Sequence, residues 1–341
     1  MDARGDRRPG RGGTARRQGR RGSGRHPQPG KAHPVRPEPT RRPVKDVTVL
    51  TNPAAGSGRA AGVAGAAVAR LRELGVRTHV EAGTDPRDAL RRARAAVDRG
   101  VDALVVVGGD GMAALAVQAL AGTDVPLGVV PAGTGNDVAR QYGLPRGNPG
   151  AAAEVVAAGR TLRVDTGLVE TADGTSRYFV SVLAIGFDSL VSDRANRMRR
   201  PRGRARYNIA MLRELAGLRP LPFRLVLDGG REVIARDLAL ASVGNSRSYG
   251  GGMLICPDAD PCDGLLDLTL VDAMPRARLV RFFPTVFTGG HVRRSEVTTR
   301  RTTSLRVESP GINVYADGDH VGPLPAEIRV VPRSLSLLVP D

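Results

Sequence analysis

Residues 101–112 read VDALVVVGGDGM. The continuous apolar run Val101–Val107 is typical of a β-strand that is buried on both faces of a sheet. The glycines that follow it predict a tight turn, and Met112–Leu120 has the spacing of a helix. In an open α/β sheet, such a turn lies at the carboxyl end of a strand, where ligands bind. The stretch therefore predicts a parallel sheet with a binding loop at its edge.

The flanking sequence repeats this alternation of strand and helix. Strands are predicted at Val47–Leu50, Val76–Val80 and Leu127–Val130, and helices at Arg59–Leu74 and Pro86–Arg99. Alternation of this kind favours a parallel sheet covered by helices on both faces. We therefore predict a Rossmann-like, three-layer α/β domain over residues 45–160.

After about residue 160 the pattern changes to extended segments. These are Leu162–Glu170, Arg177–Val182, Phe223–Leu227, Val233–Val243, Leu266–Val271, Ser304–Glu308 and Glu327–Val331, with helices at Tyr207–Ala216 and Arg276–Phe283. We predict an antiparallel, β-rich domain over residues 161–334, with the last residues, about 335–341, packing back on the first domain. The cleft between two such domains is the natural place for an active site.

Residues 1–44 predict a disordered basic tail, because Arg, Gly and Pro dominate and little there could be buried. Fourteen Lys and Arg and three acidic residues fall within residues 1–45, so this segment supplies +11 of the net charge of +17. The tail contains no aromatic residue to stack on bases, so no specific nucleic-acid partner is expected. No apolar run is long enough for a membrane span or a secretory signal, and we expect a cytoplasmic protein.

Three Gly-rich turns follow predicted strands. They read NPAAGSG (52–58), GGDG (108–111) and PAGTGND (131–137). Glycines let backbone N–H groups approach phosphate oxygens, and the helices that follow favour negative charge. Because Lys31 and Lys45 are the only lysines, a Walker A loop is excluded. Residues 56–61 also fit G-x-G-x-x-A, with Glu81 placed to bind a ribose. The Asn52-Pro53 ahead of these glycines and the two further Gly-rich loops, which hydride transfer does not require, tell against a dinucleotide site.

Carboxylates accompany these turns. Asp110 and Asp137 lie within them, and Asp165 lies at the predicted domain junction. Carboxylates beside a phosphate loop commonly hold Mg²⁺. Asp317-Gly318-Asp319 supplies further carboxylates, although Asp-Gly is also a common turn.

Six motifs in order, from residue 46 to the C-terminus, resemble the diacylglycerol kinase catalytic superfamily. Besides the Asn52-Pro53 turn, GGDG and PAGTGND, these are GNSRSYGGGM (244–253), DGLLDL (263–268) and DGD (317–319). The resemblance implies an ATP-dependent lipid kinase with an NAD kinase-like and phosphofructokinase-like first domain. It also implies Mg²⁺ as a cofactor and a diacylglycerol-like lipid as the acceptor.

The resemblance assigns roles residue by residue. It implies Asp319 as general base, where the family has Glu, with Asp110, Asp137 and Asp165 as an acidic network around Mg-ATP. A structural Mg²⁺ would be bound by Asp263 and by the carbonyls of Asp260 and Leu265. The implied nucleotide contacts are Asn52, Gly56, Thr84, Gly108, Gly109, Asp110, Gly111, Met112, Ala113, Ala114, Gly133, Thr134 and Asn136.

Three departures from the family pattern keep alternatives open. Met112 replaces a Thr, Leu115 stands where Glu is common, and Asp319 is one methylene shorter than Glu. A catalytically impaired nucleotide- or membrane-binding homologue is therefore one alternative. An NAD kinase is another, although the chain lacks the Asn-Glu pair that would bind a nucleotide acceptor.

The expected partners follow from the lipid substrate and the charge. We expect a protein peripheral to the inner face of the membrane, attracted to anionic lipid by the basic tail and by the arginines of Arg194–Arg206. A homodimer is a further expectation.

Overall fold

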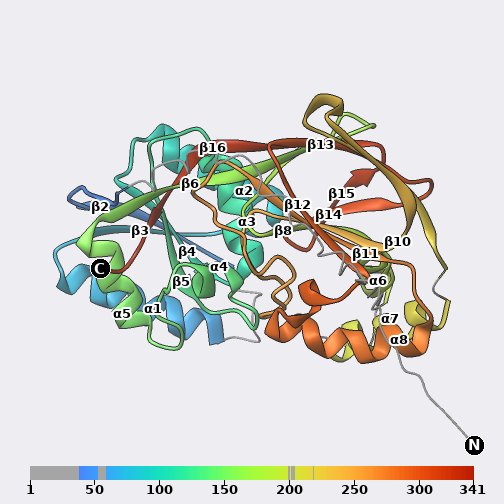
Figure 1. The fold of residues 1–341 in the computed structure, drawn as a ribbon. Coiled ribbons are helices and arrows are strands. Elements are labelled where there is room, and N and C mark those ends of the chain that lie inside the picture. The colour runs from blue at the N-terminus through green and yellow to red at the C-terminus, as the bar shows by residue number, and fades with distance from the viewer. Residues whose placement is uncertain (1–37, 53–58, 199, 201–203, 218) are drawn as a thin grey trace, which may run out of the picture. The chain divides into compact units, whose positions relative to one another are not determined.

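The computed structural model describes residues 38–52, 59–198, 200, 204–217 and 219–341, and the predicted tail lies almost wholly outside these ranges. The first half of the chain alternates strands and helices (Figure 1). Its elements are β1 (Thr40–Arg41), β2 (Asp46–Thr51), α1 (Arg59–Glu73), β3 (Arg77–Ala82), α2 (Pro86–Asp98), β4 (Ala103–Gly108), α3 (Asp110–Leu120), β5 (Leu127–Pro131), α4 (Asp137–Gln141) and α5 (Pro149–Ala158).

Strands β3, β2, β4 and β5 lie side by side in that order and are parallel. Every residue of β4 is buried, because alternate side chains enter different cores. Val105 and Val107 pack with α1 and α5, whereas Leu104 and Val106 pack with α2 and α3. Residues 46–158 therefore form the three layers that the alternation predicted.

The second half is dominated by antiparallel strands. Its strands are β6 (Arg160–Thr171), β7 (Ser176–Phe179), β8 (Val182–Gly186), β9 (Leu221–Leu227), β10 (Glu232–Gly244), β11 (Leu266–Asp272), β12 (Val297–Thr302), β13 (Ser304–Glu308), β14 (Asn313–Ala316), β15 (Asp319–Pro323) and β16 (Ala326–Leu338). Its helices are α6 (Phe187–Arg197), α7 (Arg204–Gly217), α8 (Arg276–Phe282) and the 3₁₀ turns η2 (Asp228–Gly230), η3 (Phe283–Thr288) and η4 (Gly290–Arg293). The predicted fold class, an α/β part followed by an antiparallel β-rich part, is confirmed.

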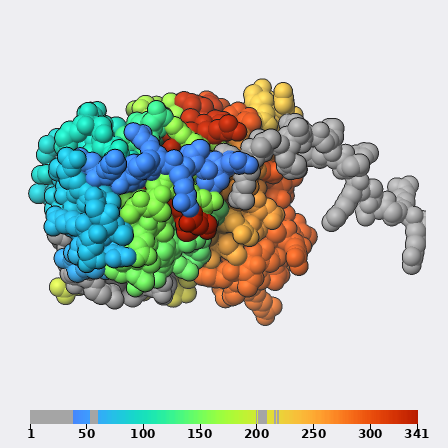
Figure 2. All heavy atoms as spheres, turned by 90° about the vertical axis from the view of Figure 1, so that its left-hand side faces the viewer, coloured from blue at the N-terminus to red at the C-terminus, as the bar shows by residue number. Residues whose placement is uncertain are grey.

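The long strand β16 connects the two parts. It pairs antiparallel with β13 and β6, and its end at Leu337 pairs parallel with Leu127 of β5. The register shifts between Val331 and Leu335, where Arg333 has a φ of +51°. This bulge redirects the strand, and the C-terminal residues (dark red) lie among the blue and green segments of the first half (Figure 2). The structure thus has one continuous sheet.

The extended segment predicted at Arg177–Val182 is in fact two strands. Strand β7 ends at Phe179 and β8 begins at Val182. Between them, the N–H groups of Val180 and Ser181 donate to the carboxylate of Asp317 at 2.9 and 2.8 Å. Because a side chain takes these two donors, they cannot join a strand ladder. Among the described residues, no helix is long and apolar enough to cross a membrane.

Close packing between β6 and β7 gives the first prediction. A Cβ at Gly167 would overlap the ring of Phe179, whereas Gly62 in α1 has open space around it. Gly167→Ala should therefore lower the free energy of unfolding by about 1–3 kcal/mol, the usual cost of overpacking. Gly62→Ala should raise it by up to about 1 kcal/mol, because Ala favours a helix. Denaturant unfolding measures both, and equal values for the two variants would contradict this packing.

Candidate active site

Two of the Gly-rich loops, GGDG (108–111) and PAGTGND (131–137), touch each other at the carboxyl edge of the parallel sheet. Gly109 caps α3, and Gly133 lies in the loop that follows β5. A Cβ at Gly133 would overlap the backbone of Gly109, so both positions need glycine. Asn136, at a φ of +54°, closes the second loop by exchanging hydrogen bonds with the backbone of Gly133.

Two buried or part-buried carboxylates meet at this contact. A Cβ at Gly135 would lie 2.6 Å from Oδ2 of Asp110 and 3.5 Å from Oδ2 of Asp137. The other oxygen of Asp110 accepts from the N–H of Val138 at 3.0 Å. Burial raises the pKa of Asp110, and the charge of Asp137 raises it further. A cation between the two carboxylates would relieve this unfavourable charge.

Asp137 joins the α/β part to the loop after β10. Its carboxylate accepts from Oγ of Ser248 at 3.0 Å and from the N–H of Gly251 at 2.6 Å. Arg140, one turn along α4, donates to it at 2.8 Å. The motif GNSRSYGGGM carried these donors, but nothing local in the sequence showed which carboxylate they would bind.

Asp165 lies on β6, beside the bulge of β16. Its carboxylate accepts from the N–H of Arg333 at 2.7 Å and from that of Gly264 at 2.8 Å. Burial raises the pKa of Asp165, although these two bonds oppose the shift. Asn245 donates to the carbonyl of Asp165 at 2.9 Å. The structure therefore makes Asp165 a junction between β6, β16 and the loop that contains Asp263.

That loop is rich in negative charge. Burial, with the charges of Asp258 and Asp260, raises the pKa of Asp267 to about 7. One oxygen of Asp267 is buried without a hydrogen bond, and the nearest cation, Arg301, lies 3.7 Å away. Arg301 also forms an ion pair with Asp263.

A cation suits the charge of this loop. Among the described residues, no three acidic, His or Cys side chains gather around one point. A metal ion here would therefore depend on carbonyl ligands beside Asp263, as the proposed set with Asp260 and Leu265 does. Residues 260–265 accordingly fit a bound Mg²⁺ by charge and donor type.

The two carboxylates of Asp317-Gly318-Asp319 differ in their surroundings. Asp317 is tied to Val180 and Ser181, and burial raises its pKa to about 6. The side chain of Asp319 is half exposed and pairs with Arg177 at 2.5 Å. Only Asp319 is therefore placed to meet a molecule from outside. Arg177 was not predicted, because its contact spans 142 residues.

The remaining predicted nucleotide contacts lie mainly on the first half. Ala113 and Ala114 are buried in α3, and Met112 is buried against Gly108. The backbone of Thr84 donates to Asp88 on the exposed start of α2. Gly108 ends β4, Gly111 lies in the first turn of α3, and Thr134 lies in the loop between β5 and α4. Asn52 follows β2, whereas Gly56 lies outside the described residues.

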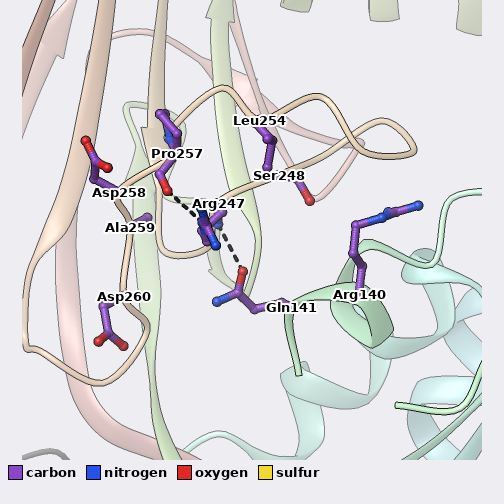
Figure 3. A pocket seen from close by; sticks show the side chains of 9 residues that line it. All are labelled: Arg140, Gln141, Arg247, Ser248, Leu254, Pro257, Asp258, Ala259 and Asp260. Atoms are coloured by element: carbon purple, nitrogen blue, oxygen red, sulfur yellow. Dashed lines mark hydrogen bonds between the residues drawn. The ribbon is translucent and has the colours of Figure 1, made fainter. Parts of the chain in front are cut away.

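A hollow of about 510 Å³ is lined by Arg140 and Ser248, the two side chains that donate to Asp137 (Figure 3). Arg140 and Gln141 of α4 line one side, and the loops of Arg247–Ser248 and Leu254–Asp260 line the other. Arg247 is fixed there, because its Nε donates to the carbonyl of Pro257 at 2.6 Å. The volume is within the range of small-molecule sites.

The structure disfavours the dinucleotide alternative. Glu81, the residue that would bind a ribose, ends in ion pairs with Arg92 and Arg99. Its carboxylate is thus already neutralised on the outer strand β3.

Comparisons with known proteins agree with this architecture. Residues 46–169 match the family model described as the diacylglycerol kinase catalytic domain, and residues 181–339 match the YegS C-terminal NAD kinase beta sandwich-like domain. A diacylglycerol kinase of Mycobacterium tuberculosis is 56% identical over 300 residues, which cover 88% of this chain and 97% of that protein. The diacylglycerol kinase of Bacillus subtilis is 28% identical over 275 residues, with 80% and 88% covered.

A crystal structure of a diacylglycerol kinase from Bacillus anthracis has the same fold. It superimposes with a TM-score of 0.65 at 20% identity, and the match covers 87% of this chain and 97% of that one. The chain therefore belongs to the diacylglycerol kinase family, as its motifs predicted, and is a lipid kinase. ATP is the phosphate donor that this family implies.

The pKa of Asp317 predicts a pH dependence of stability. Because the folded pKa is about 6 and the ordinary value is 3.8, the folded state binds a proton that the unfolded state has lost between these pH values. The free energy of unfolding should therefore fall as pH rises from about 4 to 6, by at most about 3 kcal/mol from this group. Asp317→Asn should remove that part of the slope. Urea unfolding at several pH values across this range measures the slope. If the free energy of unfolding depends on pH in the same way in the wild type and in Asp317→Asn, Asp317 titrates normally.

Proposed function

We propose that the chain transfers the γ-phosphate of ATP to the hydroxyl of diacylglycerol or a similar lipid, with Mg²⁺ as cofactor. The convergence of Asp110 and Asp137 on the loop Ser248–Gly252 carries the proposal. It places two carboxylates, two Gly-rich loops and the start of α3 at one edge of the sheet. The 56% identical relative is itself named a diacylglycerol kinase, which supports the acceptor class.

The nucleotide phosphates would lie against the touching loops. Backbone N–H groups and the N-terminal end of α3 attract negative charge there. The proposed contacts are Asn52, Gly56, Thr84, Gly108, Gly109, Gly111, Met112, Ala113, Ala114, Gly133, Thr134 and Asn136. Those that are buried, such as Ala113, would contribute through their backbone. In this proposal residues 45–160 bind the nucleotide, residues 161–334 bind the lipid, and residues 335–341 belong to the first domain.

The carboxylates would hold the metal. Asp110 and Asp137 face the same point and can accept a shared cation, and Asp165 orders the neighbouring loop. When bound, Mg²⁺ neutralises charge that develops on the transferred phosphate. Asp263, with the carbonyls of Asp260 and Leu265, would hold a second, structural Mg²⁺.

Asp319 would accept or orient the proton of the lipid hydroxyl. It is the exposed member of the Asp-Gly-Asp turn, and Arg177 holds its carboxylate in one position. A positioned base typically contributes about 10²–10⁴-fold to a rate. Arg177 is therefore proposed as a positioning residue for Asp319.

Two alternatives remain distinct from this proposal. The NAD kinase-like alternative requires a nucleotide acceptor, and the impaired-homologue alternative rests on Met112 and Asp319. Met112 is buried in the core and offers no hydroxyl where the family has Thr.

The partners proposed from the sequence concern the membrane. The basic tail and Arg194–Arg206 are proposed to attract anionic lipid at the inner face of the membrane. Part of this segment lies outside the described residues, and Arg194 is ion-paired with Glu214. A homodimer is proposed as well.

Removal of the negative charge of Asp110 should nearly abolish phosphate transfer. Asp110→Asn keeps the acceptor for Val138 but removes the charge, so turnover should fall at least about 10²-fold while the melting temperature stays close to that of the wild type. Transfer of labelled phosphate to diacylglycerol in mixed micelles measures this. Asp98→Asn, at the exposed C-terminal end of α2, is the control and should retain activity. Full activity of Asp110→Asn, or of the wild type in excess chelator, would refute the assignment.

If Asp319 is the general base, its loss should change kcat and leave nucleotide binding unchanged. Asp319→Asn should lower kcat by roughly 10²–10⁴-fold with little change in KM for ATP, because the base does not bind the nucleotide. Arg177→Ala should lower kcat, and Arg177→Lys or added guanidinium should restore part of it. If Asp319→Asn turns over at the wild-type rate, the base must be sought elsewhere.

A further inference from the structure

The segment Arg276–Arg293 presents an apolar face to solvent. Leu279, Phe282 and Val286 of α8 and η3 are buried against the core beneath them. On the outside, Val280 is 54% exposed and Phe287 is 48% exposed. Large apolar side chains gathered on one exposed face commonly mark a site of interaction.

The outer residues form one group. The rings of Phe283 and Phe287 meet edge to face, with centroids 5.8 Å apart. Val280 precedes Phe283 by three residues, which places it on the same side of the helix. By contrast, the exposed residues Leu74, Val80 and Val233 lie elsewhere, just after α1, on β3 and on β10.

Arginines surround this face. The segment between Asp272 and Glu296 contains five arginines, namely Arg276, Arg278, Arg281, Arg293 and Arg294, and no Asp or Glu. Arg278 pairs with Glu296. Within the described part of the chain, Arg276, Arg281 and Arg293 form no ion pair. Their charge is therefore available to an anionic partner.

The same segment is joined to the hollow shown in Figure 3. The N–H of Leu254 donates to the carbonyl of Val286 at 3.0 Å, and Gly289 packs against Pro257. Both Leu254 and Pro257 line the hollow. Helices α6, α7 and α8 lie at the same end of the β-rich part (Figure 1). A partner held on α8 would thus lie next to the loop that borders the candidate active site.

We propose that α8, η3 and η4 form a docking surface for a bilayer that contains anionic lipid. Val280, Phe283 and Phe287 would enter the interface, while Arg276 and Arg281 would contact phosphate headgroups. Apolar side chains combined with long basic ones are typical of interfacial membrane binding. The charge complementarity favours anionic lipid over another protein. The inference rests on the proposed function, because a kinase that takes a lipid from a bilayer has to dock on it.

Vesicle flotation of the full-length protein tests the surface without requiring catalysis. Val280→Ser with Phe287→Ser should weaken binding to phosphatidylcholine–phosphatidylglycerol vesicles roughly tenfold or more, at 0.1 M salt and at 1 M salt. At 1 M salt the Debye length is about 3 Å, so attraction by the basic tail is screened and the apolar contribution remains. Arg276→Ser with Arg281→Ser should weaken binding at 0.1 M salt only.

Two pairs of matched variants serve as controls. Val80→Ser with Val233→Ser removes exposed apolar side chains elsewhere, and Arg87→Ser with Arg94→Ser removes exposed arginines of α2. Both should bind vesicles like the wild type. All four double variants should keep the wild-type melting temperature and its activity on detergent-dispersed diacylglycerol.

Other outcomes would overturn the inference. Unchanged flotation of Val280→Ser with Phe287→Ser at 1 M salt would show that the apolar face does not enter the bilayer. Loss of concentration-dependent self-association in that variant, with flotation unchanged, would assign the face to a second copy of the chain. If the wild type floats as expected but phosphorylates no micellar lipid, the proposed function fails and the docking surface stands.

Discussion

The carboxylate of Asp137 is the interaction on which the site depends. It begins α4, yet it accepts hydrogen bonds from Ser248 and Gly251, which belong to the loop after β10. Burial of a carboxylate without such donors would strongly destabilise the folded state. The donors therefore fix the β-rich part against the edge of the parallel sheet, at the point where Asp110 also arrives. The same group that would bind a cation thus also assembles the site.

A second constraint fixes the α/β part and the β-rich part to each other. Strand β16 begins among antiparallel strands and ends beside β5 of the parallel sheet. The bulge at Arg333 that makes this possible donates its N–H to Asp165. Asp165 also accepts from Gly264, so the loop with Asp263 is tied to the same carboxylate. A rigid connection of this kind suits a reaction in which the acceptor has to be aligned with a phosphate bound on the other half.

The sequence predicted β2 to β5 and α1 to α3, because they follow from apolar periodicity, but it did not predict α5, α6, β12, β14 or β15. The run at 101–107 is apolar throughout, and the strand it forms is buried on both faces. The sequence did not predict the break between β7 and β8, nor the full length of β16. Both depend on distant partners, Asp317 for Val180 and Asp165 for Arg333. No local pattern contains that information.

In the candidate site, too, local motifs could be predicted from the sequence, whereas contacts between distant residues could not. The Gly-rich loops and their carboxylates could be read directly, since backbone approach and charge require particular residue types in adjacent positions. Residue types alone could not separate Asp317 from Asp319, because both flank one glycine, and only the family resemblance favoured Asp319. The structure separates them by their surroundings, with Asp317 bound to backbone donors and Asp319 facing outward beside Arg177. Arg177 itself has no motif around it.

The proposed reaction passes phosphate from ATP to a lipid hydroxyl. The most direct measurement offers the wild-type protein labelled ATP with diacylglycerol in mixed micelles and NAD together, with Mg²⁺ present. Extraction into organic solvent then separates the two products. The account predicts label in a lipid phosphate and none in a nucleotide product. Label in the aqueous nucleotide fraction, or no transfer to either acceptor, would contradict it.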